Sequence, residues 1–407
     1  MKKYNVFLIS LLLMLGCTSG PMSENELLEQ AKKIHAEIVT IDTHTDTPLA
    51  FLRPGFDLSG INNTSKNKVD LAKMDKGLLD AAFFAVFIGQ GVRTPEKYAE
   101  AHKTALEIFN AVNKEISRNQ QYTAIAVNSS DAKKFKSEGK KAIYIGVENG
   151  YPIGLELPIL EQYFNLGARY LTLCHTRNNQ ICDSSTDPDG AEHNGLSPFG
   201  KDVVKELNRL GMLVDVSHVS DKAFYDAVEL SAVPVFASHS CVRAVCNNPR
   251  NLTDDMLRKL AEKGGVVQIC LLSDYVKESP PQPKRDSAFI ELRKKYGNFR
   301  DLPPEVYKAA IEDWYSIDEI YPPIKATVSD LVDHIDHVVK TVGVDYVGIG
   351  SDFDGGGSLN GCNDASEMVN ITVELLRRGY SKKDIEKIWG GNFFRVMRLA
   401  EEFSKPY

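Results

Sequence analysis

Eight short apolar runs recur along this 407-residue chain, and segments of helical character separate most of them. The runs cover residues 38–41, 81–88, 142–147, 168–173, 213–216, 233–237, 265–269 and 346–349. The helical segments include residues 95–117, 157–166, 200–210, 221–230, 254–263 and 329–342. Strands that alternate with helices are typical of parallel β-α units, and eight such units predict an α/β fold closed into a (β/α)8 TIM-type barrel. An open, doubly wound sheet is the alternative, but its usual Gly-x-Gly-x-x-Gly motif does not follow the first run.

Two long segments interrupt this alternation. Residues 45–68 are polar and rich in Asn, Gly and Ser, and residues 273–326 contain three Pro-Pro pairs with short helical stretches between them. Both follow predicted strands, so both should lie on the face of the barrel that carries the active site. A segment as long as 273–326 usually forms a lid, an interface or a small subdomain. We expect residues 17–407 to form one barrel domain with this insertion, closed on the outside by helices within residues 364–403.

The first 16 residues resemble a bacterial lipoprotein signal peptide. Two lysines precede a mostly apolar stretch, residues 6–15, which is too short to span a bilayer. We therefore expect export, cleavage before Cys17 and a lipid anchor on Cys17 in a bacterial cell envelope, facing the periplasm or the cell surface. An ordinary secretory signal, with Cys17 incidental, is the alternative. Residues 401–407 contain no hydrophobic tail, so no GPI anchor is expected.

The overall composition limits the partners. The formal net charge of −7 argues against nucleic acid, because no basic excess exists to neutralise phosphates. Hydrophobic residues make up 43% of the chain and charged residues 25%, which is typical of a globular protein with an ample core. Six cysteines besides Cys17 could pair in an exported protein, and their pairing is left open.

Ionisable side chains end or follow six of the eight apolar runs. They are His44 and Asp46 after the first run, Glu148 after the third, His175 after the fourth, His218 after the fifth, His239 after the sixth and Asp352 after the eighth. The carboxyl ends of parallel strands meet on one face of a barrel, and this face carries function. Helix capping would favour Ser, Thr, Asn and Asp here rather than four histidines. Each residue taken singly could be a buried, hydrogen-bonded group, but together they predict a metal site of the zinc type.

A second polar group, Asp333-His334-x-Asp336-His337, is interpreted differently. It lies in a segment whose apolar residues recur at helical spacing. The polar residues are therefore predicted to form the solvated face of a helix and not a metal site.

The strand-end residues belong to a larger series of short motifs. These motifs occur in a fixed order and cover nearly the whole chain. They are Asp42-x-His44-x-Asp46, Val69-Asp70-Leu71, Gly146-Val147-Glu148-Asn149, Leu171-Thr172-Leu173-x-His175, Asn208-Arg209-Leu210-Gly211-Met212, Asp215-Val216-Ser217-His218-Val219-Ser220, Ser238-His239-Ser240, Pro249-Arg250-Asn251, Gly350-Ser351-Asp352-Phe353-Asp354-Gly355 and Gly391-Asn392-x-x-Arg395-Val396. Together they resemble the membrane dipeptidase family, also called renal dipeptidase, of the metal-dependent amidohydrolase superfamily.

The resemblance implies a site for two Zn²⁺ ions. His44 and Asp46 would hold one ion, His218 and His239 would hold the other, and Glu148 would bridge them. The implied reaction is zinc-dependent hydrolysis of the peptide bond of dipeptides by a metal-bridging hydroxide. Dipeptides that contain D-residues are among the expected substrates.

The resemblance also assigns catalytic and substrate-binding roles. Asp352 would move a proton from the attacking water to the leaving amine, and His175 would stabilise the developing oxyanion. Arg250 would bind the terminal carboxylate, so that His175, Arg250 and Asp352 all contact the substrate. Asp354 is expected to be a turn or supporting residue. The resemblance also implies that the protein forms a homodimer.

Other functions are compatible with the same residues. Another binuclear amidohydrolase activity, on lactones or N-acyl amino acids, is the nearest alternative. A lipoprotein that binds the substrate without hydrolysing it is a second alternative. Such a protein would be expected to have lost a metal-ligating side chain or the proton-transferring carboxylate, and all of these are present here. The stretch Gln268-Ile269-Cys270-Leu271-Leu272 departs from the Asn and aromatic residues that the family often has after the seventh strand, which leaves the side-chain preference open.

Overall fold

The computed structural model describes residues 22–52, 55–61, 66–297 and 302–404, so the expected signal peptide and Cys17 lie outside it. The strands are β1 (Ile41–Thr45), β2 (Ala81–Phe87), β3 (Thr123–Ile125), β4 (Lys141–Glu148), β5 (Ala168–Thr172), β6 (Leu213–Asp215), β7 (Phe236–Ser240), β8 (Val266–Ile269) and β9 (Val347–Ile349). The α-helices are α1 (Glu24–Glu37), α2 (Pro48–Phe51), α3 (Leu71–Lys76), α4 (Pro95–Arg118), α5 (Asp131–Ser137), α6 (Pro158–Asn165), α7 (Pro198–Leu210), α8 (Asp221–Leu230), α9 (Asp254–Glu262), α10 (Ser273–Val276), α11 (Pro283–Tyr296), α12 (Pro304–Ile320), α13 (Val328–Val342), α14 (Val369–Arg377), α15 (Lys382–Glu386) and α16 (Asn392–Ser404). One-turn helices are η1 (Tyr151–Ile153), η2 (Val344–Tyr346), η3 (Ala365–Glu367) and η4 (Lys387–Gly391).

Eight parallel strands form the barrel, in the order β1-β2-β4-β5-β6-β7-β8-β9. A parallel bridge between Thr45 and Phe353 joins the first strand to the segment after the last. The Asp42 side chain strengthens this closure, because its Oδ1 accepts the backbone N–H of Ser351 at 2.7 Å. The predicted (β/α)8 barrel is confirmed.

Two strands begin three residues later than predicted, and one strand was not predicted. The first and sixth runs were placed at residues 38–41 and 233–237, whereas β1 and β7 continue through polar residues that include His44 and His239. These polar residues stay in the strands because their side chains find partners inside the barrel. The short strand β3 pairs with β4 outside the barrel order, and its three residues are too few to give a periodic signal.

Local capping explains where the outer helices begin and end. Ser23 forms a capping box with Glu26 at the start of α1. Ser197 accepts the N–H of Gly200 at the start of α7, and Gly211 ends this helix in the left-handed region at φ +74°. Such caps fix the helix ends that pack on the barrel.

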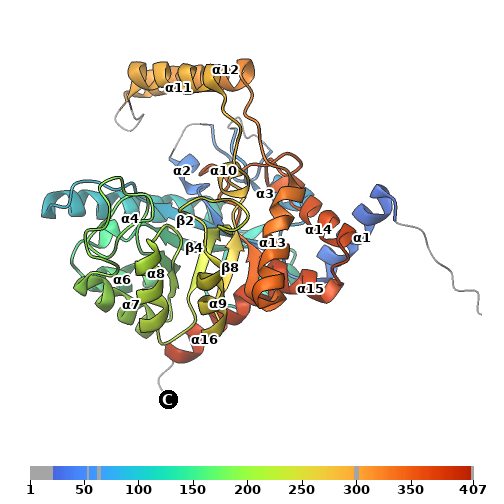
Figure 1. Cartoon of the computed structure of the whole chain (residues 1–407), viewed down its shortest axis with the longest axis horizontal. Helices are drawn as coiled ribbons and strands as arrows, with labels where there is room; N and C mark the ends of the chain where they lie inside the picture. Colours follow the sequence, from blue (N-terminus) through green and yellow to red (C-terminus); the bar gives the residue numbers. More distant parts are fainter. Residues whose placement is uncertain (1–21, 53–54, 62–65, 298–301, 405–407) are drawn as a thin grey trace, which may run out of the picture.

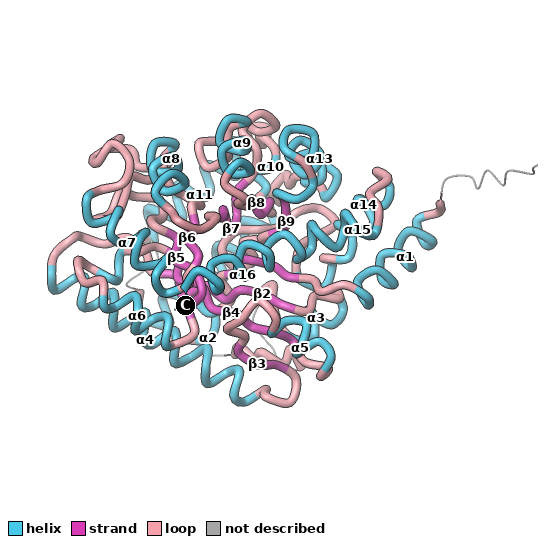
Figure 2. Tube along the Cα trace, turned by 90° about the horizontal axis from the view of Figure 1, so that it is seen from below, coloured by secondary structure: helices cyan, strands magenta, loops and turns pink. Residues whose placement is uncertain are grey.

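Aromatic side chains fill the lower part of the barrel. The ring of Phe83 lies 5.0 Å from those of both Tyr144 and Tyr170, and 5.4 Å from that of Phe393, measured between centroids. Phe393 comes from α16, which crosses the lower end of the barrel (Figure 2). These side chains are fully buried, so the interior is a packed core below the site.

The helical stretches expected in the long insertion are present, but only α10 is short. The other two, α11 and α12, form a helical hairpin that stands above the carboxyl ends of the barrel strands on two connecting segments (Figure 1). Pro-Pro pairs bracket the hairpin because proline interrupts helices and extends the connecting chain.

The prediction of a solvated face for residues 333–337 is wrong for His334. This side chain is fully buried, accepts the N–H of Val242 at Nδ1, and has its Nε2 2.7 Å from the carbonyl oxygen of Val276. His337, one turn further on α13, instead pairs with Asp254 at 2.7 Å. Among the described residues, no helix is both long and apolar enough to cross a membrane.

Candidate metal centre

The barrel brings all the predicted strand-end residues to one site. His44 lies in β1 and His239 in β7, Glu148 ends β4, and the others follow their strands: Asp46, His175, His218 and Asp352. All of these side chains are buried except that of His175, which is 21% exposed at the mouth of the site. Their burial removes water as a partner, so their partners must come from the protein or from a bound ion.

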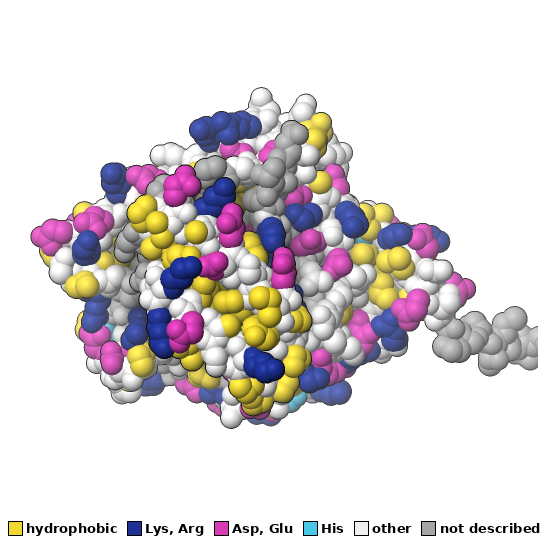
Figure 3. All heavy atoms as spheres, turned by 90° about the horizontal axis from the view of Figure 1, so that it is seen from above, with side chains coloured by type: hydrophobic (Ala, Val, Ile, Leu, Met, Phe, Trp, Pro, Cys, Tyr) yellow, Lys and Arg dark blue, Asp and Glu magenta, His cyan; other side chains and the backbone are white. Residues whose placement is uncertain are grey.

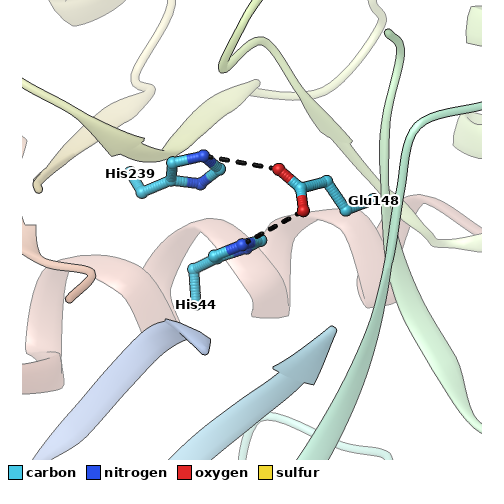
Figure 4. A group of neighbouring side chains, drawn as sticks. All are labelled: His44, Glu148 and His239. Carbon is cyan, nitrogen blue, oxygen red and sulfur yellow. Dashed lines mark ion pairs between the residues drawn. The ribbon is translucent and has the colours of Figure 1, made fainter. Parts of the chain in front are cut away.

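Glu148 lies at the centre of the cluster. Its Oε2 is 3.5 Å from Nε2 of His44. Its Oε1 is 3.0 Å from Nε2 of His218, 3.5 Å from that of His239 and 3.8 Å from that of His175. Figure 4 shows the carboxylate lying between His44 and His239 with one oxygen toward each ring. A carboxylate with oxygens directed to different imidazoles can bridge two metal ions.

Three overlapping groups of side chains have ligand atoms within 4.8 Å of one another. They are His44 with Glu148 and His239, Glu148 with His175 and His218, and His44 with Asp46 and Asp352. Because Glu148 and His44 are shared, the groups form one extended cluster. Its size suits a binuclear centre better than a single ion.

Several ligand atoms in this cluster are buried without a hydrogen-bond partner. They are Nε2 of His44, Oδ1 of Asp46 and Oε2 of Glu148. A buried polar atom without a partner costs free energy, and three at one place indicate a missing partner. Imidazole nitrogens and carboxylate oxygens are the ligands that zinc-type divalent ions prefer. The residues therefore fit a bound metal.

The protonation of the histidines supports this assignment. Burial lowers the pKa of His218 and His239 well below the usual value, helped by Arg250 and by neighbouring histidines. Both rings are thus neutral and can offer a lone pair. Burial also opposes a charge on His44, but the Glu148 carboxylate outweighs it and raises the pKa of His44 to about 10. A cation at Nε2 of His44 would take the place of that proton.

Two carboxylates lie against the backbone of Gly355. A side-chain carbon on Gly355 would stand 2.2 Å from Oδ1 of Asp352 and 2.2 Å from Oδ2 of Asp46. Burial first, and Glu148 in addition, raise the pKa of Asp46 well above its usual value. Burial likewise raises the pKa of Asp352 to about 7, against the opposing effect of His44. Crowded carboxylates of this kind are stabilised by a cation.

The backbone is strained at two residues of the site. His218 and Asp352 have φ values of +70° and +59°, in the left-handed region that few residues other than glycine adopt. Such conformations persist where the surroundings impose them, and they concentrate at functional sites.

Partners behind the proposed ligands orient two of the imidazoles, and the sequence analysis assigned them no role. The Tyr170 hydroxyl lies 2.8 Å from Nδ1 of His44. The Ser238 hydroxyl donates to Asp215 at 2.6 Å and lies 2.8 Å from Nδ1 of His239. Since Ser238 gives its proton to Asp215, it accepts one from His239, and Nε2 of that ring is left with its lone pair toward Glu148. An Asp within an apolar run was the only sequence signal of this arrangement.

Arg250 lies beside the cluster at the end of β7. It is buried, and its terminal nitrogens donate to Oγ of Ser240 at 3.3 Å and to the carbonyl of His239 at 3.1 Å. Its Nε has no hydrogen-bond partner, and the guanidinium stands 5.2 Å from the centre of the Tyr275 ring. Arg250 can therefore still bind an anion.

Asp354 is a turn residue, as expected. It adopts φ +67°, and its carboxylate accepts from the Thr47 hydroxyl at 2.7 Å and from the N–H of Lys68 at 2.6 Å. It thereby fixes the loop after β1 beside the cluster.

A barrel with a buried cluster of histidines and carboxylates at the carboxyl ends of its strands defines a metalloenzyme site. Residues 28–407 match the family described as membrane dipeptidase (Peptidase family M19). The chain therefore belongs to the membrane dipeptidase family, as its motifs predicted.

Known relatives agree with this assignment. The chain is 30% identical to Dipeptidase tcpJ of Claviceps purpurea (strain 20.1) over 355 residues, 86% of this chain and 72% of that protein. It is 30% identical to Dipeptidase 3 of Rattus norvegicus over 391 residues, 93% of this chain and 69% of that protein.

Solved structures have the same fold. The probable dipeptidase PvdM from Pseudomonas aeruginosa superimposes with a TM-score of 0.80 at 32% identity, over 93% of this chain and 99% of that chain. A metallo peptidase from Rhodobacter sphaeroides, liganded with a phosphinate mimic of the dipeptide L-Ala-D-Ala, gives a TM-score of 0.72 at 21% identity over 89% of this chain and 99% of that chain.

Proposed function

We propose that this protein hydrolyses the peptide bond of dipeptides with the help of two zinc ions. The observation that carries the proposal is the position of Glu148, whose two oxygens face different buried imidazoles in a cluster of unpartnered ligand atoms. In this proposal His44 and Asp46 hold one ion, and His218 and His239 hold the other. Bound zinc supplies an activated water at neutral pH and polarises the scissile carbonyl.

Asp352 is the proposed proton carrier. Its carboxylate lies next to that of Asp46, on the same side of Gly355, and is buried away from bulk water. A carboxylate in this position can accept a proton from the attacking water and deliver it to the leaving amine.

His175 and Arg250 are the proposed substrate contacts. His175 is the exposed member of the cluster, so its ring can donate to the oxyanion that forms from the substrate carbonyl. Arg250, with an unpartnered Nε, would bind the terminal carboxylate of the dipeptide. A carboxylate-binding arginine favours a dipeptide over a neutral lactone.

Purified protein loaded with zinc and assayed against paired L,L and L,D dipeptides tests the proposal. We expect dipeptide hydrolysis, and a loss of about 100-fold or more in kcat for Asp352→Asn. Lactones and N-acyl amino acids belong in the same panel. Turnover of these without any dipeptide turnover, or full dipeptidase activity in Asp352→Asn, would contradict the proposal.

Two further parts of the proposal concern location and assembly. Export with a lipid anchor at Cys17 predicts that Cys17→Ser abolishes incorporation of labelled fatty acid and releases the protein from the membrane fraction. A homodimer predicts twice the chain mass in light scattering. Either result can be negative without affecting the catalytic proposal.

A further inference from the structure

The hairpin of α11 and α12 is held together by its own contacts. The Phe289 and Trp314 rings meet edge to face with centroids 4.6 Å apart, and Arg285 pairs with Asp318 at 2.8 Å. At its base, the Gln282 side chain donates to the carbonyl of Pro322 at 3.1 Å, so the two connecting segments lie side by side. The hairpin is thus a separate unit attached to the barrel through a narrow base.

A cavity of about 1180 Å³ lies between this hairpin and the metal centre. Asp46, Gly355 and Gly356 line its inner end, and Leu49 of α2 and Leu52, which follows this helix, line one side. The outer wall is α12, through a set of residues spaced alternately three and four apart: Glu305, Lys308, Glu312, Tyr315 and Glu319. This spacing places them on one helical face, together with Ile311. The Lys66 ammonium, 3.8 Å from the Tyr315 ring centre, connects this wall to the opposite loop.

The cavity is larger than a small dipeptide requires. Pockets for drug-sized ligands have volumes of roughly 300–1000 Å³, and a dipeptide such as Ala-Ala is smaller than such ligands. The lining of the cavity mixes apolar side chains, including Leu49 and Ile311, with charged ones of both signs, including Glu312 and Lys308. The surface of the molecule seen from this side shows the same mixture (Figure 3). A single sign of charge therefore does not select what binds here, whereas apolar contact can.

The position of Arg250 gives the substrate a direction. Arg250 lies at the end of β7, whereas the inner end of the cavity is formed by residues after β1 and β9. A dipeptide with its carboxylate at Arg250 and its scissile bond at the metal centre points its N-terminal residue toward the cavity.

We propose that α12 is the outer wall of the substrate site and that it selects dipeptides with a large N-terminal side chain, which packs against Ile311 and Tyr315. This inference rests on the proposed dipeptidase function. It assigns the insertion a role in specificity, through contact with a part of the substrate remote from the reacting bond.

Excision of the hairpin tests the proposal. Residues 283–320 are replaced by a short Gly-Ser linker, which the adjacent base segments allow. The measured quantity is the ratio of kcat/KM for Trp-Ala to kcat/KM for Ala-Ala. We expect this ratio to fall about tenfold or more in the excised protein, and several-fold in Tyr315→Ala, because apolar contacts to a substrate side chain change specificity by about 10- to 200-fold. Ile290→Ala, on the exposed part of α11, is the matched control and should keep the wild-type ratio.

The outcomes separate the two proposals. If the wild-type protein hydrolyses neither dipeptide, the proposed function fails. If it hydrolyses both and neither the excision nor Tyr315→Ala lowers the ratio, the role of α12 is wrong. If the excision lowers kcat/KM for Ala-Trp relative to Ala-Ala, and leaves the ratio for Trp-Ala unchanged, the direction assigned to the substrate is wrong. Should the excised chain not fold, judged by circular dichroism, Tyr315→Ala and Ile311→Ala decide the question.

Discussion

The proposed ligands of the metal centre are oriented by residues that would not touch the metal themselves. His239 is oriented by Ser238, and Ser238 is oriented by Asp215, which also accepts the N–H groups of Ser217 and Ser238. Tyr170 performs the same task for His44, and its ring is held in the aromatic core. The centre is therefore built from the barrel interior upward.

Ser238→Ala should weaken metal binding. Without the hydroxyl, Nδ1 of His239 loses its acceptor, and the ring is free to choose the wrong tautomer. We expect a loss of about 10- to 100-fold in metal affinity, measured by competition with a chromogenic chelator. Ser238→Thr keeps the hydroxyl and serves as the control. Equal affinities in both variants would contradict the role of Ser238.

Gly355→Ala should disturb both carboxylates beside it. The added methyl group would stand 2.2 Å from oxygens of Asp46 and Asp352, and one of them must move. A displacement of about 1 Å can cost about 100-fold in rate. We expect a fall of this order in kcat/KM together with less bound metal, measured by elemental analysis. Wild-type activity and metal content would show that the site tolerates the methyl group.

At the scale of elements, the packing of α1 depends on a buried neutral histidine. His35 has Nδ1 3.2 Å from the carbonyl of Leu78 and Nε2 2.7 Å from the Thr372 hydroxyl of α14. Trp389 donates to the same hydroxyl at 2.6 Å, so Thr372 gives its own proton to His35. The ring is therefore neutral, with its proton on Nδ1.

Acid should destabilise the protein through His35. Burial lowers the pKa of His35 to about 4 in the folded state, compared with about 6.5 when unfolded. Between these values the unfolded chain binds a proton that the folded chain refuses, so stability is lost as the pH falls from about 6.5 to 4. Over this pH range the free energy of unfolding falls by about 3 kcal/mol. The difference in unfolding free energy between wild type and His35→Gln, followed over this pH range, measures it. A difference that does not vary with pH would contradict the assignment.

At the scale of the whole molecule, bound metal ions would connect barrel strands to one another. The proposed ligands come from the ends of β1, β4, β6 and β7, so bound ions would connect strands that the chain order separates. An ion that binds the folded chain but not the unfolded chain raises the free energy of unfolding.

Removal of the metal should therefore lower the unfolding temperature. We expect a fall of about 5 °C or more after chelation, restored by zinc and measured by differential scanning fluorimetry. His218→Ala should bind fewer ions than the proposed two. His337→Ala, which changes a histidine paired with Asp254 outside the centre, should keep the full metal content. Full metal content in His218→Ala would contradict its role as a ligand.

The sequence predicted the barrel because strands covered on both faces leave long apolar runs, such as the one that became β2. It also predicted the residues that meet at the site, because each follows or ends a run. It could not predict the contact of Tyr170 with His44, which joins residues 126 positions apart and depends on the packing of the core. Nor could it predict that His334 is buried, because helical periodicity does not reveal a neighbouring loop that covers the polar face.

The aromatic side chains that fill the lower part of the barrel have a consequence for the synthesis of the chain. Phe393 belongs to the last helix, yet it packs against Phe83 from the second strand and against Phe236 at 5.5 Å. A nascent chain on the ribosome has therefore made every barrel strand before the residue that seals the interior exists. Until α16 emerges, the lower opening exposes aromatic rings to chaperones or to other chains. The interior of the barrel is thus complete only after α16 has been made.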